Sequence, residues 1–163
     1  MARIDIRIQQ ADFDVSDEIA RLVDGLPDTG AVVTFSGLCR SEDGTLSALE
    51  LEHYPGMAEA EIRRIADDVA GRWPVTALCA IHRVGKIAPG ENIVLVIAAS
   101  AHRHAAFDAA SFLMDFLKSQ APFWKKEHRA DGSEGGWVDA KESDLDPLSR
   151  WGDNSSKNRL LRK

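Results

Sequence analysis

The sequence contains few cysteines and no long apolar run, and each of these absences excludes a class of protein. Its two cysteines, Cys39 and Cys79, form no C-x-x-C pair, so we expect two buried free thiols rather than a disulfide framework. The five histidines show no zinc-ligand spacing, and no metal site is predicted. The longest apolar run, residues 93–99, is far too short to span a bilayer.

Common catalytic motifs are missing as well. The chain has no G-x-S-x-G, Walker loop, G-x-G-x-x-G or H-E-x-x-H sequence, which removes the usual indications of a hydrolase, a nucleotide-binding enzyme or a zinc protease. The formal net charge of -6 argues against nucleic acid as the main partner. The N-terminus has no long hydrophobic segment, so we do not expect a signal peptide. We therefore expect a cytoplasmic protein without a membrane, metal or other cofactor.

What is present is the composition of one globular domain. The 163 residues are 44% hydrophobic and 28% charged, which is enough for a single substantial core. No internal repeat or linker divides the chain. A single domain is therefore predicted over residues 1–151, followed by a polar tail, residues 152–163, that is expected to be disordered.

The spacing of apolar residues predicts the secondary structure. Residues 37–44 form a polar loop between glycines, and Trp137 and Val138 are expected to add at most one short strand. The order βα-ββ-α-ββ-α favours an α+β fold over a doubly wound parallel sheet. Strands are expected at residues 4–8, 31–36, 46–54, 75–81 and 93–99, and helices at residues 16–25, 57–73 and 101–120.

The start of the last predicted helix carries an unusual cluster of cations. His102, Arg103 and His104 fall in its first turn. Free N–H groups and the positive end of the helix dipole disfavour cations there unless an anion is bound among them. This pattern indicates a phosphate site, and the alternative is a set of solvated surface cations.

Lysines gather at the other end of the same helix. Lys118 lies on its polar face, and Lys125 and Lys126 follow the Pro-Phe-Trp turn. Apolar walls and nearby cations make a lysine easier to deprotonate, which suits proton transfer near neutral pH. With Arg40 in the polar loop, these residues suit a small phosphate-bearing substrate. In the alternative reading, Lys118 pairs with Asp115 and the arginine is merely solvated.

Five runs of sequence resemble one protein family. They occur in order and cover nearly the whole chain, from the first strand to about Trp151. The chain resembles the large, catalytic subunit of molybdopterin synthase, the MoaE family, and the resemblance implies an α/β hammerhead-like fold with an additional small antiparallel β subdomain. The five runs are Gly30–Arg40, Leu51–Met57, Ile81–Gly85, Ser100–Arg103 and Leu117–Glu127.

The resemblance implies a sulfur transfer. The family converts cyclic pyranopterin monophosphate to molybdopterin by installing two dithiolene sulfurs, a step of molybdenum cofactor biosynthesis. The sulfur arrives as a thiocarboxylate on the C-terminal glycine of a small ubiquitin-like subunit, whose tail enters a pocket of the large subunit. Two large subunits form a central homodimer with one small subunit at each end, which makes a heterotetramer.

Residue roles follow from the same resemblance. It implies that Lys118 and Lys125 are catalytic. The loop departs from some relatives at Leu38 and Ser41, where lysine and an Asn or Asp occur instead. His82, which follows the fourth predicted strand, is interpreted as a packing or surface residue. The implied substrate-binding residues are Leu38, Cys39, Arg40, His102, Arg103, Lys118, Lys125, Lys126 and Glu127.

Two other functions are compatible with the residues. The chain could be a non-catalytic module that grips a ubiquitin-like tail, or a lyase or isomerase that forms a Schiff base on Lys118 with a phosphorylated sugar. The Gly135–Gly136 pair is internal, so we do not expect the chain itself to be the thiocarboxylated carrier. The order of the five runs favours sulfur transfer over both alternatives.

Overall fold

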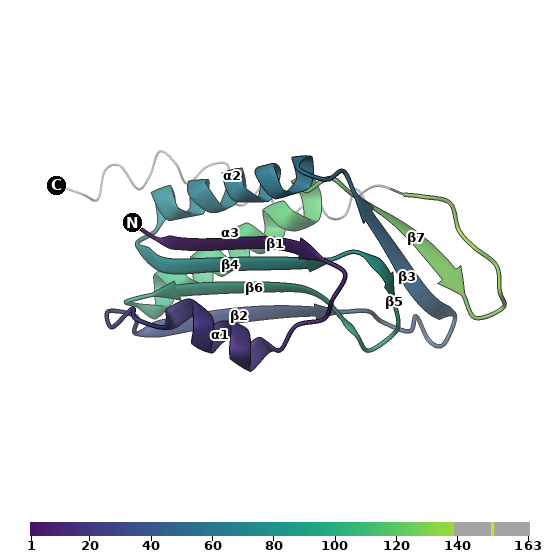
Figure 1. Ribbon diagram of the computed structural model, residues 1–163, viewed down its shortest axis with the longest axis horizontal. Coiled ribbons are helices and arrows are strands. Elements are labelled where there is room, and N and C mark those ends of the chain that lie inside the picture. The colour runs from purple at the N-terminus through teal and green to yellow at the C-terminus, as the bar shows by residue number, and fades with distance from the viewer. Residues whose placement is uncertain (139–150, 152–163) are drawn as a thin grey trace.

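A computed structural model describes residues 1–138 and residue 151, which form an α+β fold with three helices and two sheets (Figure 1). This confirms the predicted fold class. The helices are α1 (Val15–Val23), α2 (Met57–Arg72) and α3 (Arg103–Gln120). The strands are β1 (Arg3–Gln9), β2 (Ala31–Leu38), β3 (Leu46–His53), β4 (Val75–Arg83), β5 (Gly85–Ile87), β6 (Asn92–Ser100) and β7 (Phe123–Arg129).

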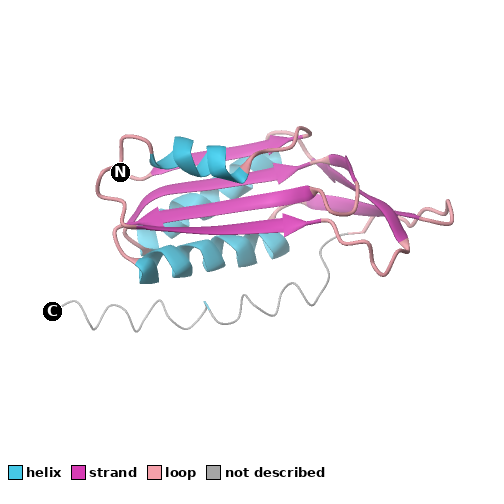
Figure 2. Ribbon diagram, turned by 90° about the horizontal axis from the view of Figure 1, so that it is seen from below, coloured by secondary structure: helices cyan, strands magenta, loops and turns pink. Residues whose placement is uncertain are grey.

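The larger sheet has the strand order β1-β4-β6-β2 and lies between helices. β1 and β4 are parallel, whereas β6 is antiparallel to both of its neighbours, β4 and β2. Alternate side chains of β6 enter two separate cores, as expected for a strand covered on both faces. Val94, Val96 and Ala98 join the core beneath α2 and α3, and Leu95, Ile97 and Ala99 join the core beneath α1 (Figure 2).

Helix α1 begins where the sequence supplies a cap. The N-cap is Asp14, whose carboxylate accepts a hydrogen bond from the backbone N–H of Asp17 at 3.0 Å. Leu22 turns inward from the last turn of the helix and is 5% exposed. The cap and this apolar face therefore fix both the start of α1 and the side that it buries.

The smaller sheet contains the two elements that the spacing did not predict. It has the antiparallel order β5-β3-β7 and lies beyond one end of the larger sheet (Figure 1). Pro122 follows the end of α3, but the chain then forms β7 instead of remaining the predicted Pro-Phe-Trp turn. Val138 makes only an isolated bridge with Lys125. Strand β7 pairs with β3, which is distant in sequence, so local spacing does not reveal it.

Both cysteines are free and buried, which confirms that prediction. Burial raises the pKa of Cys79 to about 11 and also raises the pKa of Cys39, so both thiols stay protonated near neutral pH. No helix in residues 1–138 is both long and apolar enough to cross a membrane. The proposed tail after residue 151 lies outside the described residues. The cytoplasmic location stays a prediction.

Candidate active site

A cavity of about 300 Å³ lies where the end of α3 meets the smaller sheet. Its volume is at the lower end of the range for small-molecule sites. Among the described lining residues, its two cationic side chains are Lys118 from α3 and Lys125 from β7. Most of its wall is apolar and includes Leu38, Leu51, Ile93, Met114 and Leu117. The structure thus brings both predicted catalytic lysines into one cavity.

Each lysine reaches the cavity for a separate reason. Lys118 is in the last turn of α3, next to the buried Leu117, where a cation also complements the negative end of the helix dipole. Lys125 is opposite Leu51 in the antiparallel register of β7 and β3. Asp115, the alternative partner that spacing suggested for Lys118, accepts a hydrogen bond from Trp151 Nε1 at 2.7 Å.

His82 also lines this cavity, and sequence reasoning missed it as a site residue. Its ring stacks on Phe123, with the ring centroids 3.9 Å apart, and its Nδ1 lies 2.9 Å from the backbone oxygen of Arg83. Burial, and to a lesser degree the nearby Lys118 charge, lower the pKa of His82 to about 4. The imidazole is therefore neutral at physiological pH. The signal for His82 in the sequence is the alternation of β4. His82 lies on the same strand face as Ala80, which is buried under the helices.

The predicted phosphate site lies at the far end of α3. His102 is the N-cap and Arg103 the first residue of the helix, and both are exposed. The fifteen residues from Arg103 to Lys118 separate them by about 22 Å along the helix axis, at about 1.5 Å per residue. One chain therefore does not place the helix-start cations beside the cavity lysines.

The loop residues divide in a similar way. Leu38 is 51% exposed and lines the cavity, whereas Cys39 is 4% exposed and packs in the core of the smaller sheet. Arg40 points into solvent, with its guanidinium 3.0 Å from the carboxylate of Glu42. Of the loop residues predicted to bind substrate, only Leu38 contacts the cavity in the described chain.

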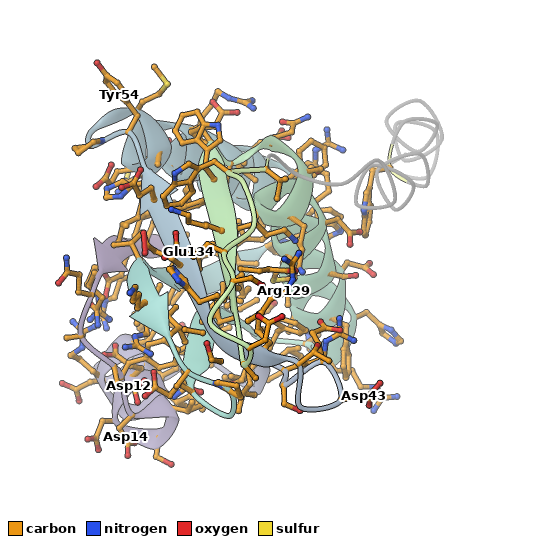
Figure 3. The ribbon with its side chains drawn as sticks, turned by 90° about the vertical axis from the view of Figure 1, so that its right-hand side faces the viewer. Asp12, Asp14, Asp43, Tyr54, Arg129 and Glu134 are labelled. Atoms are coloured by element: carbon orange, nitrogen blue, oxygen red, sulfur yellow. The ribbon has the colours of Figure 1, made fainter. Side chains whose placement is uncertain are left out.

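Lys126 and Glu127 occupy opposite faces of β7, because successive strand residues alternate. Lys126 is on the face away from Lys125, where its ammonium is 3.2 Å from Glu134 and 5.2 Å from the ring centre of Trp137. Figure 3 looks onto this end of the molecule, with Glu134 labelled beside the smaller sheet. Glu127 shares its strand face with Lys125. In this chain, Lys126 therefore stabilises the return of the chain after β7.

One further cluster contains side chains that could ligate a metal ion, but its carboxylates are already paired with arginines. Potential ligand atoms of Asp5, Glu18 and Cys79 lie within 4.8 Å of one another. The guanidinium groups of Arg7 and Arg21, however, already bind both carboxylates. Because burial keeps the Cys79 thiol protonated, the cluster is an ion-pair network between β1 and α1 and fits a metal poorly.

Comparison with known proteins decides the family. The family model described as MoaE protein matches residues 8–120. The chain belongs to the MoaE family. A molybdopterin synthase catalytic subunit from Mesorhizobium japonicum is 70% identical over 150 residues, which cover 92% of this chain and 94% of that protein. The predicted family is therefore confirmed.

Solved MoaE structures share the fold. The molybdopterin biosynthesis MoaE protein from Burkholderia ambifaria aligns with a TM-score of 0.80 and 45% identity, over 93% of this chain and 99% of that one. A structure titled as the complex of subunits 1 and 2 of molybdopterin-converting factor from Helicobacter pylori aligns with a TM-score of 0.69 over 84% of this chain and 90% of that one. At 20% identity, it supports the fold alone.

The function of this MoaE chain follows at the level of the family. It is that of a molybdopterin synthase catalytic subunit in molybdenum cofactor biosynthesis, and the enzyme is a sulfurtransferase. This confirms the predicted activity. The two lysines in an apolar-walled cavity give that activity a physical location to test.

Proposed function

We propose that sulfur transfer takes place in the cavity between Lys118 and Lys125. The observation that carries this proposal is the convergence of these lysines, from α3 and β7, on one largely apolar space. Ammonium groups attract anions more strongly beside apolar walls than in bulk water. Both proposed reactants are anionic. Cyclic pyranopterin monophosphate carries a phosphate, and the carrier ends in a thiocarboxylate.

The proposed reaction uses the two lysines differently. The thiocarboxylate sulfur of the carrier bonds to a side-chain carbon of the pterin and displaces the oxygen held there, and Lys118 protonates that oxygen as it leaves, which stabilises the developing negative charge. Lys125 holds the phosphate or the carbonyl of the carrier's terminal glycine. Water then adds to the carbonyl of the resulting thioester and breaks its C–S bond, which leaves the sulfur on the pterin and releases the carrier with a glycine carboxylate. A second thiocarboxylated carrier repeats the step to complete the dithiolene.

The proposed partners are a small ubiquitin-like carrier subunit and a second copy of this chain. Relatives of 60–70% identity support the first, because their names describe a catalytic subunit and so imply a further subunit. The second would form the centre of a heterotetramer. The second copy would also supply the residues that bind the phosphate, because His102 and Arg103 are about 22 Å from Lys118 within one α3 helix. A second copy could place its helix start against this cavity.

Replacing Lys118 with alanine tests the proposed chemistry. In an assay reconstituted with thiocarboxylated carrier and cyclic pyranopterin monophosphate, Lys118→Ala should lower product formation by at least about 100-fold, since proton transfer and charge stabilisation are both lost. The carrier should still bind in calorimetry. Lys86→Ala is the matched control, because Lys86 is exposed on β5 and away from the cavity lining.

Two outcomes would contradict this proposal. Normal turnover by Lys118→Ala would remove the role given to that lysine. Carrier binding without any sulfur transfer by the wild-type chain would instead favour the non-catalytic module that grips a ubiquitin-like tail.

A further inference from the structure

His82 interrupts an otherwise apolar row on β4. Leu78 and Ala80, on the same face, are buried in the core beneath α2 and α3. His82 comes next on this face and reaches the point where that core opens into the cavity. An apolar side chain would suit this position at least as well for packing, because a polar group in such a place costs free energy unless it is hydrogen-bonded.

The surroundings of the ring fix its orientation and its tautomer. One face of the imidazole is stacked on Phe123 at an interplanar angle of 15°. The Nδ1 atom is 2.9 Å from the backbone oxygen of Arg83, and since a carbonyl only accepts, Nδ1 carries the proton. The lone pair is then on Nε2. Within residues 1–138 and residue 151, no hydrogen bond to Nε2 is formed.

The charged groups around the ring favour a neutral acceptor. Lys118 faces it from α3 and His53 from β3, and both lower the pKa of His82 in addition to the larger effect of burial. Lys125 shares the cavity from β7. The residues paired with His82 on the neighbouring strands, Ile8 and Val94, are apolar. A neutral imidazole with a free lone pair therefore shares a cavity with an ammonium group.

We propose that His82 is a positioning residue for Lys118, whose ammonium group makes no hydrogen bond to Nε2 in this structure and reaches it by a change of side-chain rotamer. The inference rests on the function proposed for the cavity. A lysine side chain has many rotamers, and a fixed acceptor restricts the ammonium to the position in which it meets the reacting atoms. Because Phe123 and the Arg83 backbone hold the ring, the acceptor itself does not move.

Two amide substitutions separate this role from packing. Glutamine places its amide near the position of Nε2, whereas asparagine places its amide near Nδ1. His82→Gln should therefore keep most of the turnover, and His82→Asn should lower kcat about tenfold with little change in KM. If His82 acts only through its bond to Arg83, the asparagine variant is the active one. If only stacking on Phe123 matters, His82→Phe retains full activity. Either pattern overturns the proposal.

A second measurement needs no substrate. Acetic anhydride labels only the free amine, and mass spectrometry of the peptides can compare labelling of Lys118 with that of the exposed Lys86 in the same sample. The asparagine and phenylalanine variants should label faster at Lys118 than the wild type and the glutamine variant, because the ammonium group has lost its acceptor. Equal labelling in all four proteins overturns the proposal.

The controls distinguish the possible failures. His53→Gln changes a second histidine ring near Phe123, at a centroid distance of 6.3 Å, and should leave both labelling and turnover unchanged. If the wild type makes no product, the function proposed for the cavity fails, and the labelling still tests His82. If the wild type is active and the asparagine variant matches it, only the role of His82 fails. Thermal unfolding of each variant identifies any loss of folding.

Discussion

At the scale of single residues, His82 links the stability of the protein to pH. Its pKa is about 4 in the folded chain, against an ordinary value of 6.5. Between these values the unfolded chain binds a proton that the folded chain does not, so stability rises with pH. The contribution is fully present above about pH 6.5 and is lost as the pH falls toward 4. It amounts to at most about 3 kcal/mol, since one pKa unit corresponds to about 1.4 kcal/mol.

We therefore expect the free energy of unfolding in urea to fall between pH 7 and pH 5, and to fall less in His82→Gln. A neutral amide has no proton to gain in this range. An equal slope in the variant and the wild type would contradict the assignment.

Carboxylates change the stability of the protein at lower pH. The pKa of Glu18 is lowered by its hydrogen bond from Arg7, so its contribution is lost only as the pH falls below its ordinary value of 4.5.

At the scale of secondary-structure elements, Gly30 determines how closely β2 approaches the end of β6. Its N–H donates to the Ser100 carbonyl oxygen at 3.0 Å, and a β-carbon on it would lie 2.4 Å from the backbone oxygen of Ala101. Backbone atoms on both sides leave little room for relaxation. Gly30→Ala should therefore lower the free energy of unfolding by about 2 kcal/mol or more, as measured in urea.

Gly71 is the matched control, because it is also a glycine but has open space around it. It lies in α2, and a β-carbon there would meet nothing within 4 Å. Gly71→Ala should stabilise the protein by about 0.5–1 kcal/mol, since alanine is the better helix former. Equal effects of the two substitutions would show that the contact with Ala101 is not restrictive.

The elements also show where prediction from spacing works. Helix α3 was expected at residues 101–120 and is Arg103–Gln120, because a long apolar stripe and Pro122 define it locally. Strands β5 and β7 were missed. Strand β5 has only three residues, and β7 carries a mixed sequence whose pairing with β3 lies about 75 residues away in the chain. Pairing at that distance depends on tertiary packing and leaves no periodic signal.

At the scale of the whole molecule, the separation of Arg103 from Lys118 makes a prediction about assembly. If two copies share each cavity, co-expressed Lys118→Ala and Arg103→Ala chains form hybrids with one intact site. Random pairing should then restore about a quarter of wild-type turnover, although each variant alone is inactive. The assay is product formation by the purified mixture.

A second pair of variants is the control for this experiment. Lys118→Ala mixed with Lys125→Ala should stay inactive, because both lysines line the cavity of one chain and no hybrid has an intact site. Rescue in this control, or no rescue with Arg103→Ala, would contradict a cavity shared in the proposed way.

The sequence by itself determined the local elements and the chemical types of the site residues. Apolar spacing defines β6 as a doubly covered strand, and a cation after Leu117 belongs to the last turn of α3. Tertiary structure decided which of these residues meet. Pairing of β7 with β3 brings Lys125 to Lys118, burial makes His82 neutral, and helix length keeps Arg103 away. The reason is that periodicity acts over a few residues, whereas contact and desolvation depend on segments that are distant in the chain.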